Sequence, residues 1–344
     1  MWRFFMIISF VFIIVDAVAC SQAIPAPQQE SQAGVEAAQV DQGFQQLSNA
    51  EPEFGFTERA VDFENNGQKI VGTLTLPEGK QNSYPVILLF HGFLGFQDGV
   101  PIIGTEDGML SRTARLLAEH GYATLRISFR GSGESDGLWE DTTFSGQISD
   151  AVAAVDYLTT LDNIDLKRIG VIGLSQGGLV ASSAAAQDER IKSVVLWSPV
   201  ANPVDTYKLL LGEDKIVEGL ASDGESIDIT VVWGAEIKLK TPFFEDIYHV
   251  DPVAAITQVE DPLMVIVGLK DPIVTPQPYY GQVYLNYHEG DEMLIELDGD
   301  HIFDIRTEAG PTVFDDAIYW SIAWMQETLK PFTWKNRCCR AREL

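Results

Sequence analysis

Short apolar runs alternate with amphipathic segments along most of this chain. Runs with the length and composition of strands lie at 56–63, 69–76, 85–90, 123–128, 168–174, 193–197, 262–267 and 293–297. Apolar residues at helical spacing fill the intervals 108–119, 147–159, 176–187, 275–284 and 313–328. This alternation predicts an α/β fold with a mostly parallel eight-stranded sheet flanked by helices.

The segment from about 200 to 249 interrupts the alternation after the sixth strand and is predicted to be an inserted cap. Residues 227–231 and 236–240 alternate like strands around Trp233-Gly234-Ala235, which indicates a small hairpin. Its aromatic residues either line a pocket or form the core of the cap itself, and the sequence leaves both readings open. These residues are Tyr207, Trp233, Phe243, Phe244 and Tyr248.

The N-terminal residues predict export. Met1-Trp2-Arg3, the apolar run 4–15 and Ala17-Val18-Ala19 have the layout of a signal peptide over 1–19. Cys20 follows at once and resembles the lipidated cysteine of a bacterial lipoprotein, although Asp16 and Ala17 depart from the usual apolar residues ahead of it. Lipidation at Cys20, which would attach the protein to a membrane, and plain cleavage after Ala19 with secretion both remain open.

Composition divides the remainder of the chain. Residues 20–52 are rich in Gln, Ala, Ser and Pro and are predicted to form a flexible tether. Residues 53–335 are long enough for one catalytic domain, in a chain of 344 residues with 46% hydrophobic content. Residues 336–344 form a basic tail.

Charge and cysteine content exclude several classes of function. With 50 acidic against 23 basic residues, the net charge of −27 provides no positive field for nucleic acid or an anionic membrane. The three cysteines are Cys20, Cys338 and Cys339, so no disulfide framework is expected. No metal ion and no organic cofactor is implied.

Gly173-Leu174-Ser175-Gln176-Gly177 carries the strongest chemical signal, because it joins a predicted strand to a predicted helix. Such a turn holds its serine in a strained conformation above the sheet, at the positive end of the helix. The pattern therefore predicts Ser175 as a nucleophile.

A serine nucleophile needs a base and an acid that orients the base. His301 follows the strand 293–297, at the sheet end where Ser175 should lie. Asp271 follows the strand 262–267, which completes the order serine, acid, histidine. Asp300 is the rival acid, because it adjoins His301, but an acid on a separate loop is better placed to reach Nδ1.

A tetrahedral intermediate also needs donors for its negative oxygen. The strand 85–90 ends in His91-Gly92-Phe93-Leu94-Gly95, a turn able to present the backbone N–H of Phe93. The N–H of Gln176, directly after the serine, is the second expected donor.

Taken together, these motifs resemble the α/β-hydrolase superfamily over about 54–334. The His-Gly-Phe-x-Gly turn and Asp251-Pro252 are most similar to the feruloyl or cinnamoyl esterase group and its serine aminopeptidase-like relatives. The resemblance implies a triad of Ser175, Asp271 and His301, with oxyanion donors at Phe93 and Gln176.

The expected function is an exported serine hydrolase that cleaves small carboxylic esters through an acyl-enzyme. One alternative is an aminopeptidase or acyl-peptide hydrolase, which uses the same triad plus an acidic clamp for a peptide amine. The other is a non-catalytic binding protein, because a fold alone does not establish activity.

Overall fold

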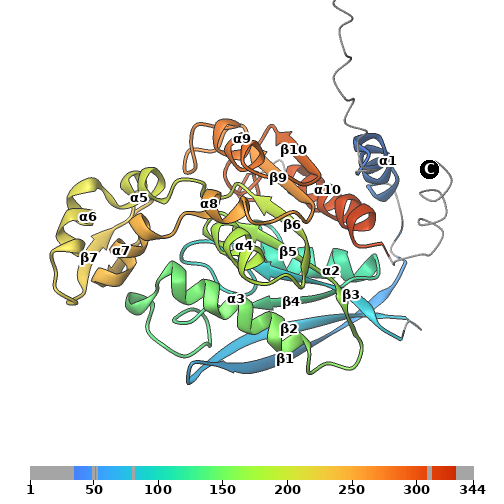
Figure 1. Cartoon of the computed structure of the whole chain (residues 1–344), viewed down its shortest axis with the longest axis horizontal. Coiled ribbons are helices and arrows are strands. Elements are labelled where there is room, and N and C mark those ends of the chain that lie inside the picture. Colours follow the sequence, from blue (N-terminus) through green and yellow to red (C-terminus); the bar gives the residue numbers. More distant parts are fainter. Residues whose placement is uncertain (1–34, 49–50, 52, 80–81, 308–311, 331–344) are drawn as a thin grey trace, which may run out of the picture. The chain divides into compact units, whose positions relative to one another are not determined.

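The computed structural model describes residues 35–48, 51, 53–79, 82–307 and 312–330. Within this part of the chain, eight strands form one sheet in the order β1-β2-β4-β3-β5-β6-β9-β10 (Figure 1). The strands are β1 Gly55–Asn65, β2 Gln68–Glu78, β3 Tyr84–Phe90, β4 Ala123–Ile127, β5 Ile164–Leu174, β6 Ile191–Trp197, β9 Leu263–Gly268 and β10 Glu292–Leu297. Only the β1–β2 and β2–β4 pairings in this sheet are antiparallel, which confirms the mostly parallel eight-stranded sheet.

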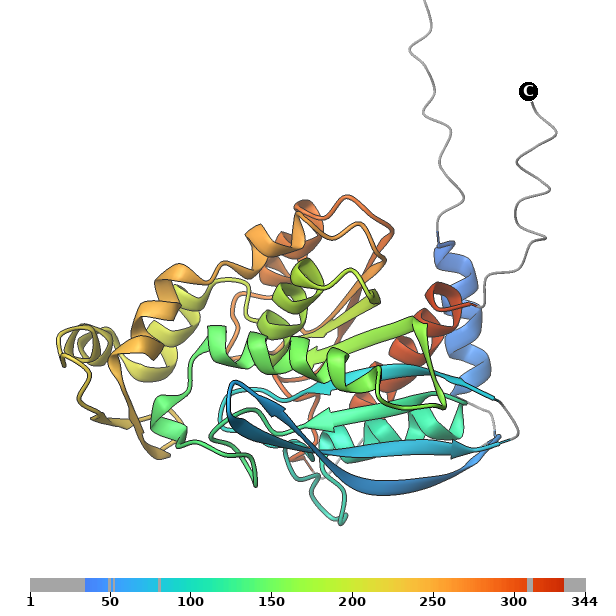
Figure 2. The same cartoon turned by 60° about the horizontal axis from the view of Figure 1, so that its bottom comes forward.

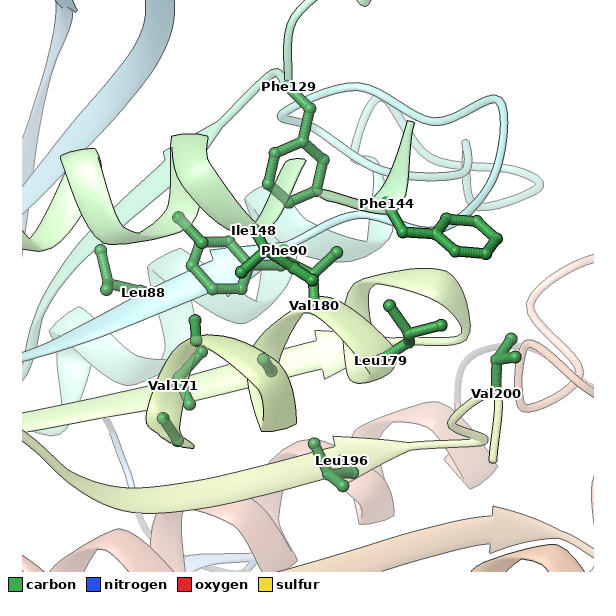
Figure 3. Close-up of a cluster of buried hydrophobic side chains, with 14 of the residues drawn as sticks. Leu88, Phe90, Phe129, Phe144, Ile148, Val171, Leu179, Val180, Leu196 and Val200 are labelled. Carbon is green, nitrogen blue, oxygen red and sulfur yellow. The ribbon is translucent and has the colours of Figure 1, made fainter. Parts of the chain in front are cut away.

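Helices cover both faces of the sheet. Along β3, Val86, Leu88 and Phe90 join one hydrophobic cluster, whereas Ile87 and Leu89 join a second cluster, as the alternation of side chains in a strand requires. Figure 3 shows the first cluster, where residues of α3 and α4 pack on β3 and β5. The helices of the two layers are α2 Met109–Glu119, α3 Phe144–Leu158, α4 Gln176–Gln187, α8 Pro252–Ile256, α9 Tyr279–Asn286 and α10 Thr312–Thr328.

The expected cap lies between β6 and β9. It consists of α5 Pro203–Leu211, α6 Glu213–Leu220, β7 Ile227–Thr230, β8 Glu236–Leu239 and α7 Thr241–His249. Strands β7 and β8 pair antiparallel, which confirms the hairpin. Figures 1 and 2 show these elements, yellow to orange, gathered beyond one end of the sheet.

The structure corrects one part of the flexible tether predicted over 20–52, whereas residues 20–34, 49–50 and 52 lie outside the described residues. Residues 37–47 form a helix, α1 Ala37–Leu47, which packs on α10. Val40 is fully buried, and the Phe44 ring stacks on Trp320 with 4.3 Å between ring centroids. Val40, Phe44 and Leu47 recur at helical spacing, and Ala and Gln are good helix formers, so this part of the low-complexity segment has an apolar face. The signal peptide, Cys20 and the basic tail lie outside the described residues.

The helix predicted at 275–284 begins later than expected. Helix α9 starts at Tyr279, directly after Pro278. Pro276 and Pro278 lack a backbone N–H and disfavour helical geometry in the residues before them, so Thr275 and Gln277 do not enter the helix. The other predicted helices and strands are present with shifted ends, the largest shift being the start of β5 at Ile164.

The packing of α1 gives a prediction for stability. Phe44→Ala should lower the free energy of unfolding by about 2 kcal/mol, because it removes a stacked ring and apolar contacts on α10. The neighbouring exposed Gln46→Ala is the control and should leave stability unchanged. Urea unfolding of the two variants measures the difference. Equal midpoints for Phe44→Ala and the wild type would show that α1 does not pack on α10 in solution.

Candidate active site

Ser175 lies on a strained turn between β5 and α4. Its backbone has φ 56° and ψ −117°, in the left-handed half of conformational space that side chains rarely adopt. The turn is fixed from both sides, because the Ser175 N–H donates to the carbonyl of Trp197 on β6 at 2.8 Å. The Ser175 carbonyl accepts from the N–H of Gly178 at 2.9 Å.

Two glycines make this turn sterically feasible. A Cβ atom at Gly173 would lie 2.1 Å from the carbonyl oxygen of Gly177. A Cβ atom at Gly177 would lie 2.4 Å from the carbonyl oxygen of Phe90, at the end of β3. Both distances are far below van der Waals contact, so the glycines flanking Ser175 are required by close approach of the backbone.

The structure joins His301 to Asp271. Asp271 is 5% exposed, and its Oδ2 accepts a hydrogen bond from His301 Nδ1 at 2.7 Å. Its Oδ1 accepts from the backbone N–H groups of Ile273 and Val274 at 2.7 and 2.9 Å. These bonds fix the carboxylate, and a His301 that donates from Nδ1 keeps Nε2 free to accept a proton.

Backbone pairing holds the two loops together. The Leu269 N–H donates to the carbonyl of Leu297 at 2.8 Å, and the Lys270 N–H donates to the carbonyl of Gly299 at 2.9 Å. The rival acid, Asp300, instead stabilises its own turn. Its Oδ1 accepts hydrogen bonds from the N–H groups of Ile302 and Asp304, each at 2.9 Å.

Ser175 and His301 line one cavity of about 390 Å³. No hydrogen bond is present between their side chains in the described structure. In unliganded enzymes such bonds are often long and tighten only when substrate binds. The apolar part of the cavity lining comprises Phe93, Leu94, Phe96, Val100, Pro101, Leu174, Leu210, Trp233, Pro272, Ile273 and Ile302.

The two expected oxyanion donors adjoin Ser175. Gln176 is the first residue of α4, where a backbone N–H has no partner within the helix. Phe93 follows Gly92, at which a Cβ atom would lie 3.2 Å from the Ser175 Cβ. In the described part of the chain, neither the Phe93 N–H nor the Gln176 N–H has an acceptor. They are therefore available to an anion at the positive end of α4.

The cap aromatics divide between the two roles that the sequence left open. Trp233 lines the cavity and is 49% exposed. Tyr207, Phe243 and Phe244 are fully buried in the hydrophobic core. Tyr248 is 51% exposed and is absent from both the cavity lining and that core.

His91 is a buried residue whose role the sequence did not reveal. Its Nδ1 donates to the Gly92 carbonyl at 2.8 Å, and its Nε2 accepts from the Phe129 N–H at 3.1 Å. This tautomer follows from the two partners. His91 thereby ties the loop that carries Phe93 to the residues after β4. Burial lowers the pKa of His91 from 6.5 to about 4, so the imidazole is neutral near pH 7.

In the part of the chain that the structure describes, no group of three or more His, Cys, Asp or Glu side chains is arranged to hold a metal ion. None of the helices in that part is both long and apolar enough to cross a bilayer.

The lowered pKa of His91 predicts a loss of stability in acid. Between pH 6.5 and pH 4 the unfolded chain binds a proton that the folded chain does not, so unfolding becomes easier as the pH falls. From pH 7 to pH 4 the wild type should lose about 3 kcal/mol more than His91→Asn. Urea unfolding at both pH values measures this. His249→Asn, at an exposed position, should behave like the wild type, and an unchanged pH dependence in His91→Asn would contradict the assignment.

Comparison with known sequences agrees with the observed fold. The family model described as the alpha/beta hydrolase fold matches residues 85–226. An uncharacterised 31.7 kDa protein of Escherichia coli, from the traX-finO intergenic region, is 26% identical over 234 residues, which cover 60% of this chain and 78% of that protein. The quorum-quenching protein AidA of Acinetobacter baumannii is 31% identical over 160 residues, which cover 44% of this chain and 49% of AidA.

Solved structures share the same fold. The ferulic acid complex of Est1E from Butyrivibrio proteoclasticus superposes with a TM-score of 0.62 at 23% identity, covering 77% of this chain and 99% of Est1E. The acylaminoacyl peptidase of Pyrococcus horikoshii gives a TM-score of 0.59 at 18% identity, covering 81% of this chain and 42% of the peptidase. With its sheet order, its inserted cap and the family model matched over residues 85–226, the chain has the α/β-hydrolase fold.

Proposed function

We propose that this protein is a serine hydrolase that cleaves carboxylic esters. The observation that carries the proposal is the 2.7 Å hydrogen bond between His301 and the buried Asp271, beside a cavity that His301 shares with the strained Ser175. A nucleophile, a base and an orienting acid on separate loops of one sheet edge are the parts that acyl transfer requires.

In the proposed reaction, Ser175 Oγ attacks the acyl carbon of the ester while His301 Nε2 accepts its proton. Asp271 stabilises the imidazolium that forms, without taking the proton itself. The N–H groups of Phe93 and Gln176 donate to the oxyanion of the tetrahedral intermediate. His301 then returns the proton to the leaving alcohol, and an acyl-enzyme remains on Ser175.

Deacylation repeats these steps with water as the nucleophile. His301 takes a proton from the water, whose oxygen attacks the acyl carbon. The second tetrahedral intermediate collapses, Ser175 regains its proton from His301, and the carboxylic acid leaves. The chemistry needs no group beyond these side chains and backbone donors.

The lining of the cavity supports an ester with an apolar acyl or alcohol group. Most of its side chains are aliphatic or aromatic, with Phe93 and Trp233 facing the same space. An aminopeptidase needs a free acidic clamp for a peptide amine. The acid in this lining is Asp300, and one of its oxygens is already occupied by two backbone N–H groups. Ester substrates are therefore the better match.

Covalent labelling tests the proposed nucleophile. A fluorophosphonate probe should modify Ser175 in the wild type, located by peptide mass spectrometry, and should fail to label His301→Ala. Ser175→Ala should lose at least about 10³-fold in the hydrolysis of a p-nitrophenyl ester, because no other group supplies the nucleophile. Folded protein that takes no label and hydrolyses no ester would favour the non-catalytic alternative.

Two matched acid variants serve as controls for the same experiment. Asp271→Asn should reduce turnover by about 10³- to 10⁴-fold, since it removes the charge that fixes the imidazole. Asp300→Asn keeps the same shape on the neighbouring residue and should retain most of the activity. The reverse ranking would transfer the acid's role to Asp300.

We also propose that the protein is exported, on the basis of the pattern in residues 1–19. Expression of the full chain in a bacterium should yield a mature protein that begins at Cys20. Intact mass spectrometry then separates a lipidated N-terminus from plain cleavage after Ala19, and Cys20→Ala should abolish any lipid-dependent mass. A mature protein that still carries residues 1–19 would contradict export.

A further inference from the structure

One cap residue contacts the side chains of both proposed oxyanion donors. Tyr207, on α5, is fully buried, and its ring packs edge-on against the Phe93 ring with 5.5 Å between centroids. The Tyr207 hydroxyl donates a hydrogen bond to Oε1 of Gln176. The two residues whose backbone N–H groups are proposed to bind the oxyanion are thus held by a single side chain of the cap.

The side-chain amide of Gln176 is held at its other end as well. Its Nε2 donates to Oε1 of Gln147, on α3, at 2.6 Å. Gln147 Nε2 in turn donates to Thr142 Oγ1 at 3.0 Å. All of these side chains are at most 1% exposed. A buried amide that is bonded at both ends has little rotational freedom, which restrains the first residue of α4.

The chain of hydrogen bonds returns to the cap. Thr142 directly follows a short 3₁₀ helix, η1 Trp139–Asp141. Lys240, directly before α7, forms ion pairs with Glu140 at 3.2 Å and Asp141 at 2.6 Å. Its backbone N–H also donates to the Glu140 carbonyl at 3.1 Å. Two parts of the cap, α5 and the segment before α7, are therefore connected by hydrogen bonds and ion pairs that run through Gln176.

The ring of Phe93 is held in a similar way. Besides Tyr207, it packs against Phe243 of α7, Trp233 of the hairpin and Trp139 of η1, with ring centroids 5.9, 6.4 and 5.4 Å away. Cap residues therefore surround one donor with aromatic rings and hold the other by a hydrogen bond. Burial raises the pKa of the Tyr207 hydroxyl well above its usual value of 10, which keeps it a donor at every pH of interest.

We propose that Tyr207 is a positioning residue that couples the position of the cap to the geometry of the oxyanion site. By contacting Phe93 and Gln176 together, it sets the direction of both backbone N–H groups, so the oxyanion site is complete only while α5 is in place. This inference rests on the proposed function and adds a dependence of catalysis on the cap.

Tyr207→Phe isolates the hydroxyl, and the chain offers a matched control. Tyr280 of α9 also donates its hydroxyl to α5, to Asp205 Oδ2 at 2.7 Å, but its side chain contacts neither oxyanion residue in the described structure. Both Tyr→Phe variants remove one hydrogen bond between α5 and the rest of the domain. Only Tyr207→Phe removes one that ends on Gln176.

The readout is affinity for a trifluoromethyl ketone, whose tetrahedral adduct with a serine carries an oxyanion, together with the single-turnover rate of acylation by a p-nitrophenyl ester. In Tyr207→Phe we expect the acylation rate to fall about tenfold and the inhibition constant of the ketone to rise by the same factor, with KM changed less than twofold. Tyr280→Phe should match the wild type in all three. Thermal unfolding is measured for each variant, so that a loss of folded protein is corrected for.

A double variant tests whether Tyr207 acts through Gln176. Gln176→Met keeps the backbone N–H but removes both side-chain hydrogen bonds, so adding Tyr207→Phe should reduce acylation little further. An equal loss in both backgrounds would overturn the proposal, as would a Tyr207→Phe variant with unchanged ketone affinity. If Tyr207→Phe does not fold, Gln147→Met removes the other bond of the same amide and carries the same expectation. A folded wild type that is neither labelled at Ser175 nor active on esters overturns the proposed function itself, and this inference with it.

Discussion

The left-handed backbone at Ser175 is the constraint on which the rest of the site depends. Holding a serine at φ 56° costs of the order of 1–3 kcal/mol, and the surrounding structure must impose it. Strand β6 and the residues that follow it do so, since the Ser175 N–H donates to the carbonyl of Trp197, and the N–H of Val200 donates to the Ser175 carbonyl at 3.1 Å. The consequence is chemical: the serine side chain reaches the cavity while the first N–H of α4 stays unpaired.

Parallel strands explain how residues distant in sequence meet at this serine. Strands β3, β5, β9 and β10 all end at one edge of the sheet, so the loops that carry Phe93, Ser175, Asp271 and His301 emerge side by side. The cap leaves the same edge after β6. It therefore reaches the cavity without any change in the sheet, which is how α/β folds acquire new substrate pockets.

Periodicity and motif order predicted the sheet, the turn that carries Ser175 and the cap, because these depend on local patterns of apolar residues and glycines. Helix α1 was not predicted, because its apolar face consists of only three residues spread through a Gln- and Ala-rich segment. The helix is stabilised by packing against α10. The hydrogen bonds of His91 and Tyr207 were not predicted, for a related reason. Each depends on partners such as Phe129 and Gln176, which are distant in sequence and brought close by the fold. A buried hydrogen bond between such partners leaves no periodic signal in the chain.

Burying amides and a phenol beneath the cap, where apolar side chains would pack, is energetically demanding. An unpaired buried polar group costs about 1–3 kcal/mol, whereas paired ones contribute little net stability. Here the Tyr207 hydroxyl and the amides of Gln176 and Gln147 all have partners. Apolar packing tolerates small sliding movements, but a fully paired polar network is satisfied in one geometry only. In the role proposed above, the cap keeps two backbone donors aimed at one oxygen, which requires that kind of geometric restraint more than additional hydrophobic area.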